Sequence, residues 1–206
     1  MMFGETPELT GAEQVLINSF ATEELKKEFN RIYQDYFDFI LSKGVDLLGS
    51  QPNKGNIAGG ISTIEEKAMG NIQKIGKASI TGILGTAEIP EKPGLYFMNT
   101  SSAAADLLTA MAAGGAVVNL FTTGKGNNVG NPICPVVKIC ANKETCYNAQ
   151  ENVDVDISEV IYGEQTLDEA AEQIAEYMVR VCSGEYTSAE ILFHEEFAPS
   201  RLFPQS

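Results

Sequence analysis

The chain has 206 residues, and its 28 acidic and 14 basic side chains give a formal net charge of −14. This length suits one domain with a substantial core, and a hydrophobic content of 44% excludes a disordered chain. Nucleic acids and anionic membranes are bound by basic surfaces. Because this protein is strongly acidic, neither is expected as a partner. No Lys/Arg-led apolar leader opens the sequence, and the most apolar stretch, 103–121, carries Asp106 and two glycines. We therefore expect a cytoplasmic protein without a membrane span.

The first 50 residues predict a short strand and two helices. The strand is expected at 1–3 and a short helix at 11–20. Thr22 can cap the next helix, in which apolar and aromatic side chains recur at helical spacing over 25–40. Such a stripe is typical of a core or interface face, and Gly44 is expected to end the helix.

The rest of the chain alternates between strand and helix patterns. Loop chemistry dominates 51–60, and a helix follows from about residue 64, because Ser62 with Glu65 or Thr63 with Glu66 has capping-box spacing. Short β-rich runs follow at 79–84, 95–98, 116–122 and 136–140. Further helices are expected at 103–113, 143–150 and 167–182, the last capped by Thr166 and Glu169 and stopped by Gly184.

This alternation predicts an α/β fold. We expect a mostly parallel sheet with helices on both faces, a Rossmann-like arrangement, plus a C-terminal helical segment. As a single domain over 1–206, it would comprise an N-terminal strand and helices (1–50), a glycine-rich core (51–150) and an acidic helical tail (151–206).

Charge and cysteine placement add two expectations. Residues 151–196 hold 13 acids and one base, whereas 52–129 hold five acids and six lysines. The middle of the chain can therefore tolerate an anionic ligand, although a solvated helical face explains the acidic tail equally well. The four cysteines are expected to be free buried thiols, not disulfides or zinc ligands: Cys134, Cys140, Cys146 and Cys182.

A first candidate segment spans 55–67. Its glycines precede a capped helix, whose positive end can bind a carboxylate or phosphate through free backbone amides. One of its two glutamates can cap the helix and the other can act as acid or base, while the lysine can stabilise an oxyanion or merely pair with a nearby acid. The candidate residues are Asn56, Gly59 and Gly60 for substrate binding and Glu65, Glu66 and Lys67 for catalysis. The alternative is a structural turn with a helix cap.

A second candidate segment spans 121–132. It leaves the end of an apolar strand, where open α/β sheets usually bind ligands. Its hydroxyl, amide and ammonium groups can bind an oxygen-rich anion, and the candidate residues are Thr122, Thr123, Gly124 and Lys125. The alternative is a long surface loop without a ligand. We expect both segments at the edge of one sheet, facing a common cleft.

Two other places carry titratable groups. Glu5, Glu8 and Glu13 lie around Pro7, where carboxylates at a strand exit can serve as base or metal ligand, or lie on the surface. His194 is the only histidine, so it cannot build a histidine-rich metal site.

Four motifs in order carry a family resemblance. They are Glu-Thr-Pro-Glu-Leu-Thr-Gly-Ala-Glu (5–13), Gly-Asn-Ile-Ala-Gly-Gly-Ile-Ser-Thr-Ile-Glu-Glu-Lys-Ala-Met-Gly (55–70), Pro-Gly-Leu-Tyr-Phe-Met-Asn-Thr (93–100) and Phe-Thr-Thr-Gly-Lys-Gly (121–126). Together they resemble the C-terminal portion of the altronate/galactarate dehydratase family, including the similar (2R)-sulfolactate sulfo-lyase large subunits.

The resemblance implies a lyase that depends on a divalent metal, Fe2+ or Mn2+, and dehydrates altronate or galactarate to a 2-keto-3-deoxy acid. Sulfite expulsion from (2R)-sulfolactate is the alternative reaction, and the runs 100–105, 130–133 and 194–197 look closer to that branch. Lys125 stands where the dehydratases usually have Arg, which weakens bidentate carboxylate recognition.

The resemblance also implies partners. The metal ligands are expected largely outside this chain, on an N-terminal subunit or on N-terminal domains, and a homo-oligomer is a further expectation. Two other classes compete with this hypothesis: a non-catalytic subunit that docks through 25–40, and a binding module for sugar acids that does no chemistry.

Overall fold

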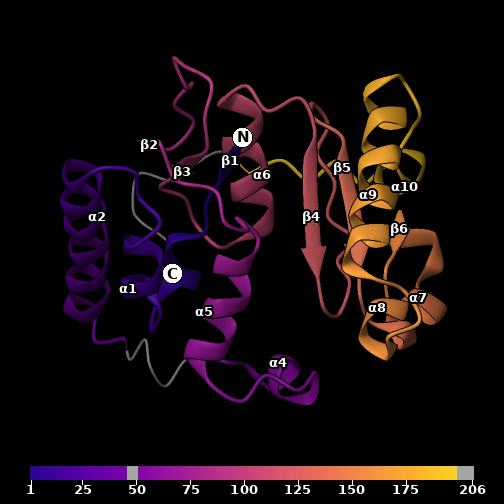
Figure 1. Ribbon diagram of the computed structural model, residues 1–206, viewed down its shortest axis with the longest axis horizontal. Coiled ribbons are helices and arrows are strands. Elements are labelled where there is room, and N and C mark those ends of the chain that lie inside the picture. The colour runs from indigo at the N-terminus through magenta and orange to yellow at the C-terminus, as the bar shows by residue number, and fades with distance from the viewer. Residues whose placement is uncertain (46–50, 199–206) are drawn as a thin grey trace. The chain divides into compact units, whose positions relative to one another are not determined.

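Parallel strands form two separate three-stranded sheets in the computed structural model, which describes residues 1–45 and 51–198 (Figure 1). The first sheet has the order β1-β3-β2, with β1 at Met2–Phe3, β2 at Gly82–Leu84 and β3 at Tyr96–Met98. The second has the order β4-β5-β6, with β4 at Asn119–Thr123, β5 at Val136–Cys140 and β6 at Val155–Asp156. All four strand pairings are parallel, so the α/β prediction is confirmed.

Helices accompany each sheet. The first unit, residues 1–114, contains η1 (Thr6–Leu9), α1 (Glu13–Ile17), α2 (Glu23–Ser42), α4 (Lys54–Ala58), α5 (Ile64–Gln73) and α6 (Ala104–Ala113). The second unit, 115–198, contains α7 (Lys143–Asn148), η2 (Gln150–Asn152), α8 (Glu159–Tyr162), α9 (Leu167–Cys182) and α10 (Ser188–Ile191). Grouping both units into one domain stays a prediction.

Helix α2 forms where the sequence predicts it. The Thr22 hydroxyl accepts a hydrogen bond from the Leu25 N–H at 3.3 Å, which satisfies a free amide of the first turn. The helix ends just before Gly44, whose φ of +73° suits glycine.

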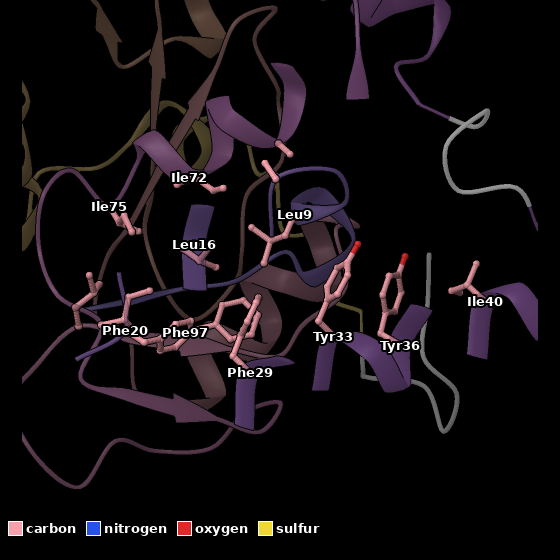
Figure 2. Close-up of a cluster of buried hydrophobic side chains, with 14 residues drawn as sticks. Leu9, Leu16, Phe20, Phe29, Tyr33, Tyr36, Ile40, Ile72, Ile75 and Phe97 are labelled. Carbon is pink, nitrogen blue, oxygen red and sulfur yellow. The ribbon is translucent and has the colours of Figure 1, made fainter. Parts of the chain in front are cut away.

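The aromatic stripe of α2 is the core of the first unit (Figure 2). The ring of Phe29 lies 5.0 Å from Phe20 and meets Phe97 of β3 edge to face at 5.2 Å. Along the same helix, Tyr33, Tyr36 and Ile40 are also buried. The suggestion that this face docks another subunit is therefore wrong, because its own unit covers it.

Helix α6 packs against the opposite face of the first sheet. Side chains alternate along a strand, so Met98 points away from its neighbour Phe97. A Cβ added at Gly114, which ends α6, would lie 2.7 Å from the Met98 methyl group. Glycine at this position therefore lets the end of the helix approach the strand.

The second unit has a smaller core against α9. Val137 and Ile139 of β5 pack with Val155 and Val181. Thr166 and Glu169 form the predicted capping box at the start of α9, and Gly184, at φ +104°, follows its end. The acidic side chains of α9 thus lie on an amphipathic helix with a buried stripe.

Three local expectations need correction. Residues 51–60 are not all loop, because Asn53 and Asn56 form a reciprocal capping box that starts α4. The sequence also gave no signal strong enough to predict η1, β6, α8 or α10, each four residues or fewer. The four cysteines are free as expected, but Cys182 is exposed and not buried.

No helix within 1–45 or 51–198 combines the length and apolar character needed to cross a bilayer.

Removal of the Phe29 ring should destabilise the first unit. Phe29→Ala deletes a fully buried ring that packs against Phe20 and against Phe97 of β3. We therefore expect the unfolding free energy to fall by about 3–5 kcal/mol. Urea denaturation followed by circular dichroism measures it. The matched control is Glu28→Ala on the exposed side of α2, which should change stability by less than about 0.5 kcal/mol. Equal stability of the two variants would contradict the packing described.

Candidate functional site

Four charged side chains meet at the carboxyl edge of the first sheet. After β1 the chain enters η1, which places Glu5 and Glu8 against helix α5. Lys67 is on α5, and Lys74 is the residue that follows its end and keeps helical backbone angles, so the two, seven residues apart, lie on one face of the helix. Each lysine pairs with one glutamate: Lys67 Nζ lies 2.9 Å from Glu8 Oε2, and Lys74 Nζ lies 3.2 Å from Glu5 Oε2. We call these four residues the edge cluster.

The Lys67–Glu8 pair is the more enclosed of the two. Only 18% of each side chain is exposed, and Lys67 also donates to Gln51 Oε1 at 2.8 Å. Lys67 therefore pairs with a carboxylate from a distant part of the sequence, and its catalytic role stays a prediction. Pairing of this kind fixes the ammonium group in place and shields it from solvent ions.

Glu5 has an unusual backbone. Its φ of +70° is in the left-handed region, which a glutamate rarely adopts. The Glu5 N–H donates to Thr100 Oγ1 at 2.9 Å, and the Thr6 N–H donates to the Thr100 carbonyl at 3.1 Å. A Cβ added at Gly4 would lie 2.3 Å from Thr100 Oγ1, so only glycine lets the chain approach so closely. Such local strain is concentrated at functional sites.

The cluster shifts the proton affinity of Glu5. Burial raises the pKa of the Glu5 carboxyl above its usual range, the charge and hydrogen bond of Lys74 oppose that rise, and the nearby Glu8 adds to it. The net effect is a raised pKa, so the Glu5 carboxylate is a stronger base than an ordinary glutamate.

Buried polar groups lie next to the cluster. Asn71, between the two lysines on α5, has a buried Nδ2 without a hydrogen-bond partner in the described ranges, and the same holds for the Tyr36 hydroxyl. Burial raises the pKa of Tyr36 to about 12, and the charge of Glu8 contributes. The hydroxyl oxygens of Tyr33 and Tyr36 point to the same side of the core (Figure 2). Asn71 Nδ2 and the Tyr36 hydroxyl are thus buried donors that no described side chain satisfies.

The glycines of the first segment are not free to bind an anion as predicted. The Gly59 N–H donates to the carbonyl oxygens of Gly55 and Asn56, and the Gly60 N–H donates to Ile57. The Asn56 side chain is used in the capping box with Asn53. These amides close helix α4, because the loop expected here is in fact a helix. Substrate binding by Asn56, Gly59 and Gly60 stays a prediction. Free backbone amides do not support it, because these amides are already hydrogen-bonded.

The two glutamates of this segment have different roles. Glu66 Oε2 accepts hydrogen bonds from the Ser62 N–H at 2.8 Å and hydroxyl at 2.7 Å, and the Glu66 N–H donates to Thr63. These bonds lower the pKa of Glu66, so it is the ionised capping acid. Glu65 is exposed, and its Cγ would lie 3.2 Å from a Cβ added at Gly11. It is thus the glutamate not used in the cap.

The second segment does lie at the carboxyl end of a parallel strand, as predicted. β4 ends at Thr123, whose hydroxyl accepts from the Lys125 N–H at 3.1 Å. The Lys125 carbonyl accepts from Thr145 of α7 at 3.2 Å, which anchors the turn. The side chains of Thr122 and Lys125 are exposed, and a Cβ at Gly124 would meet open space. Their binding roles stay predictions.

The expectation that both segments lie at the edge of one sheet is wrong, because the strands form two sheets. Gly59 and Gly60 follow helix α4 in the first unit, whereas Thr122 and Thr123 end β4 in the second sheet and Gly124 follows that strand. The common cleft stays a prediction.

The motifs at 130–133 and 194–197 contact each other. A Cβ at Gly130 would lie only 1.8 Å from the His194 carbonyl oxygen, and the Gly130 N–H donates to Glu196 Oε2 at 2.7 Å. Gly130 therefore tolerates no side chain, and His194 contributes through its backbone. Packing between 130–133 and 194–197 therefore accounts for the glycine at 130 and for the position of His194.

The sequence analysis names three of the four residues of the edge cluster and misses only Lys74. Glu5 and Glu8 were considered as base or metal ligands, but Lys74, Asn71 and Thr100 were not. A signal existed, because Lys67 and Lys74 recur at helical spacing that faces the strand exit.

The edge cluster does not have the chemistry of a metal centre. Both of its carboxylates face lysines, and residues 1–45 and 51–198 contain no group of three or more His, Cys, Asp or Glu side chains suited to a metal ion.

The Glu8–Lys67 pair should show a measurable coupling. In a double-mutant cycle with Glu8→Gln and Lys67→Met, we expect about 1 kcal/mol of coupling in unfolding free energy, because the pair is largely shielded. The control pair, Arg31 and Asp35, is mostly exposed and should couple by less than about 0.5 kcal/mol. Equal coupling in both cycles would refute the special position of the buried pair.

Comparison with known proteins covers nearly the whole chain. The family described as "D-galactarate/Altronate dehydratase, C-terminal" matches residues 1–205. The (2R)-sulfolactate sulfo-lyase subunit beta of Chromohalobacter salexigens is 48% identical over 205 residues, which is 98% of this chain and 53% of that protein. The galactarate dehydratase (L-threo-forming) of Escherichia coli is 29% identical over 89% of this chain and 35% of its own length. The altronate dehydratase of Bacillus subtilis is 31% identical over 90% of this chain and 37% of its own.

Proposed function

Because this chain belongs to the D-galactarate/altronate dehydratase C-terminal family, we propose that it is part of a lyase that removes the β-substituent of an anionic 2-hydroxy acid. The relatives named above are a sulfo-lyase subunit and dehydratases, and both names describe elimination reactions. The acid's carboxylate and its leaving group both carry oxygens that ammonium, hydroxyl and amide groups can bind.

The leaving group that we favour is sulfite. The observation that carries this choice is the 48% identity to the sulfo-lyase subunit beta, against 29–31% to the dehydratases. The substrate would then be (2R)-sulfolactate, with a carboxylate and a sulfonate. Dehydration of altronate or galactarate, expected first from the sequence, is the second candidate and rests on the family description.

The chain offers cations to such a dianion. Lys67 is largely buried at the edge cluster, whereas Lys125 is exposed just after β4, where its backbone N–H donates to the Thr123 hydroxyl. A lysine at position 125 can bind a sulfonate or carboxylate oxygen as a point charge, without the paired geometry of an arginine. We propose that Lys125 binds one acidic end of the substrate.

A partner should complete the enzyme. The chain spans about half the length of the sulfo-lyase relative and just over a third of the dehydratases. The name of that relative, subunit beta, supports a second subunit here. An iron or manganese ion, if used, would stabilise the enediolate as a Lewis acid. Its ligands would come mainly from the partner, since the edge cluster does not fit a metal. A cytoplasmic location and a homo-oligomer are also proposals.

Activity should need the partner. We expect the isolated chain to release neither sulfite from (2R)-sulfolactate nor 2-keto-3-deoxy acid from altronate or galactarate, with Fe2+ or Mn2+ present. Addition of the N-terminal partner should give sulfite release from (2R)-sulfolactate. Sulfite appearance is measured with a thiol-reactive dye, and keto-acid formation by a coupled dehydrogenase. Turnover by the isolated chain would contradict the need for a partner. If the assembled complex turned over altronate or galactarate but not (2R)-sulfolactate, the second candidate would be favoured.

Lys125 should matter in the assembled enzyme. Lys125→Ala removes an exposed cation just after β4, so kcat/KM should fall by about tenfold or more, the range for one charge-assisted hydrogen bond. Steady-state kinetics measures the loss. The control Lys77→Ala removes an exposed lysine outside both segments and should leave kinetics unchanged. Unchanged kinetics in Lys125→Ala as well would remove Lys125 from the site.

A further inference from the structure

Glu5 differs from the other glutamates near the sheet edge in three ways. It follows directly on β1, at the edge where parallel sheets bind ligands. Its backbone has φ +70°, a conformation that costs energy for a residue with a side chain. Its carboxylate is largely buried, with 18% of the side chain exposed, and Lys74 contacts one of its oxygens, Oε2.

We propose that Glu5 is a catalytic residue of this chain, the carboxylate that removes the proton from the carbon next to the substrate's carboxylate. This inference rests on the proposed elimination reaction and adds to it a residue that carries out the proton transfer.

The neighbouring acids fit this role less well. Glu8 is enclosed with Lys67, whose ammonium group lies 2.9 and 3.1 Å from its two oxygens, so both of its oxygens are engaged. Glu66 caps α5 through Ser62, and its lowered pKa makes it a weaker base. Glu65 is exposed, where water solvates the charged form. Glu5 alone among these four combines burial with a single-oxygen ion pair.

The proposed step balances as follows. Glu5 takes the proton from carbon 2 of (2R)-sulfolactate, and the electron pair of that C–H bond forms a double bond between carbons 2 and 3. The carbon–sulfur bond breaks, and its electron pair leaves with the sulfur as sulfite. The protonated Glu5 then returns a proton to carbon 3 while the enol hydroxyl gives up its proton, which the released sulfite takes up, and the product is the keto acid pyruvate. The net reaction yields pyruvate and hydrogen sulfite, with no external oxidant or reductant.

Lys74 tunes this base. The charged groups that face Glu5 are Lys74 and Lys67 from α5 and Glu8 from η1. Burial and Glu8 raise the pKa of Glu5, and the two lysines lower it, so the carboxylate stays available while being more basic than one in water.

Thr100 is a positioning residue. Its hydroxyl accepts from the Glu5 N–H at 2.9 Å and its carbonyl accepts from the Thr6 N–H, so the loop after β3 holds Glu5 in its left-handed conformation. Thr100 does not have to touch the substrate to affect the reaction.

The first test uses the complex with its partner and (2R)-sulfolactate carrying deuterium at carbon 2. Glu5→Gln should lower kcat by about 100-fold or more, the range for loss of a general base, while KM changes little. Glu5→Asp should retain part of the activity. The control Glu88→Gln removes one acid at the exit of β2, where Glu88 accepts from the Gly85 N–H, and should leave kcat unchanged. Full kcat in Glu5→Gln would overturn the proposal.

The second test measures the pH dependence of kcat/KM. Activity should rise with pH as Glu5 loses its proton, because the carboxylate is the reactive form. Lys74→Gln removes the cation that favours this carboxylate, so the pKa of Glu5 should rise and the acidic limb should move to higher pH. This readout does not depend on whether Glu5→Gln assembles with the partner. An acidic limb at the same pH in Lys74→Gln would overturn the assignment.

The third test separates positioning from folding. Thr100→Val removes the acceptor of the Glu5 N–H at nearly constant volume and should lower kcat more than KM, and Thr100→Ser should restore it. Failure of the serine variant to restore kcat would overturn the positioning role. A wild-type complex that eliminates neither sulfite nor water would refute the proposed function itself, whereas an active wild type with an equally active Glu5→Gln would refute only the role of Glu5.

Discussion

The first unit depends on two ion pairs that join the turn after β1 to helix α5. Lys67 with Glu8 and Lys74 with Glu5 connect residues about 60–70 positions apart in the sequence. They fix η1 at the carboxyl edge of the sheet, which lets Glu5 be held by Thr100 from the neighbouring strand exit. Ion pairs of this kind contribute position more than stability, since desolvation offsets much of their attraction.

Local patterns in the sequence predicted much of this fold. The strand β5 and helix α9 have the predicted bounds, and the caps at Thr22 and Thr166 form as expected. These features depend on neighbours a few residues apart, which a pattern can reveal. The division of the strands into two sheets depends on pairing between distant segments, and no local periodicity encodes it.

The candidate site was predictable only in part, for the same reason. Lys67 was identified, but its partner Glu8 lies 59 residues away and only the fold brings the two together. The glycines at 59 and 60 were assigned to anion binding because glycine before a helix cap suggests free amides. A short helix formed by Asn53 and Asn56 uses those amides instead, since an asparagine pair can cap a turn that composition alone assigns to a loop.

The pairing of β1 with β3 also bears on how the chain is made. Met2 lies beside Tyr96 and Phe3 beside Phe97, so the first strand of the chain has its partner nearly a hundred residues later. During synthesis, β1 cannot pair until β3 has emerged from the ribosome. Until then Phe29 of α2 lacks the Phe97 ring that packs against it, so apolar surface on the nascent chain stays exposed.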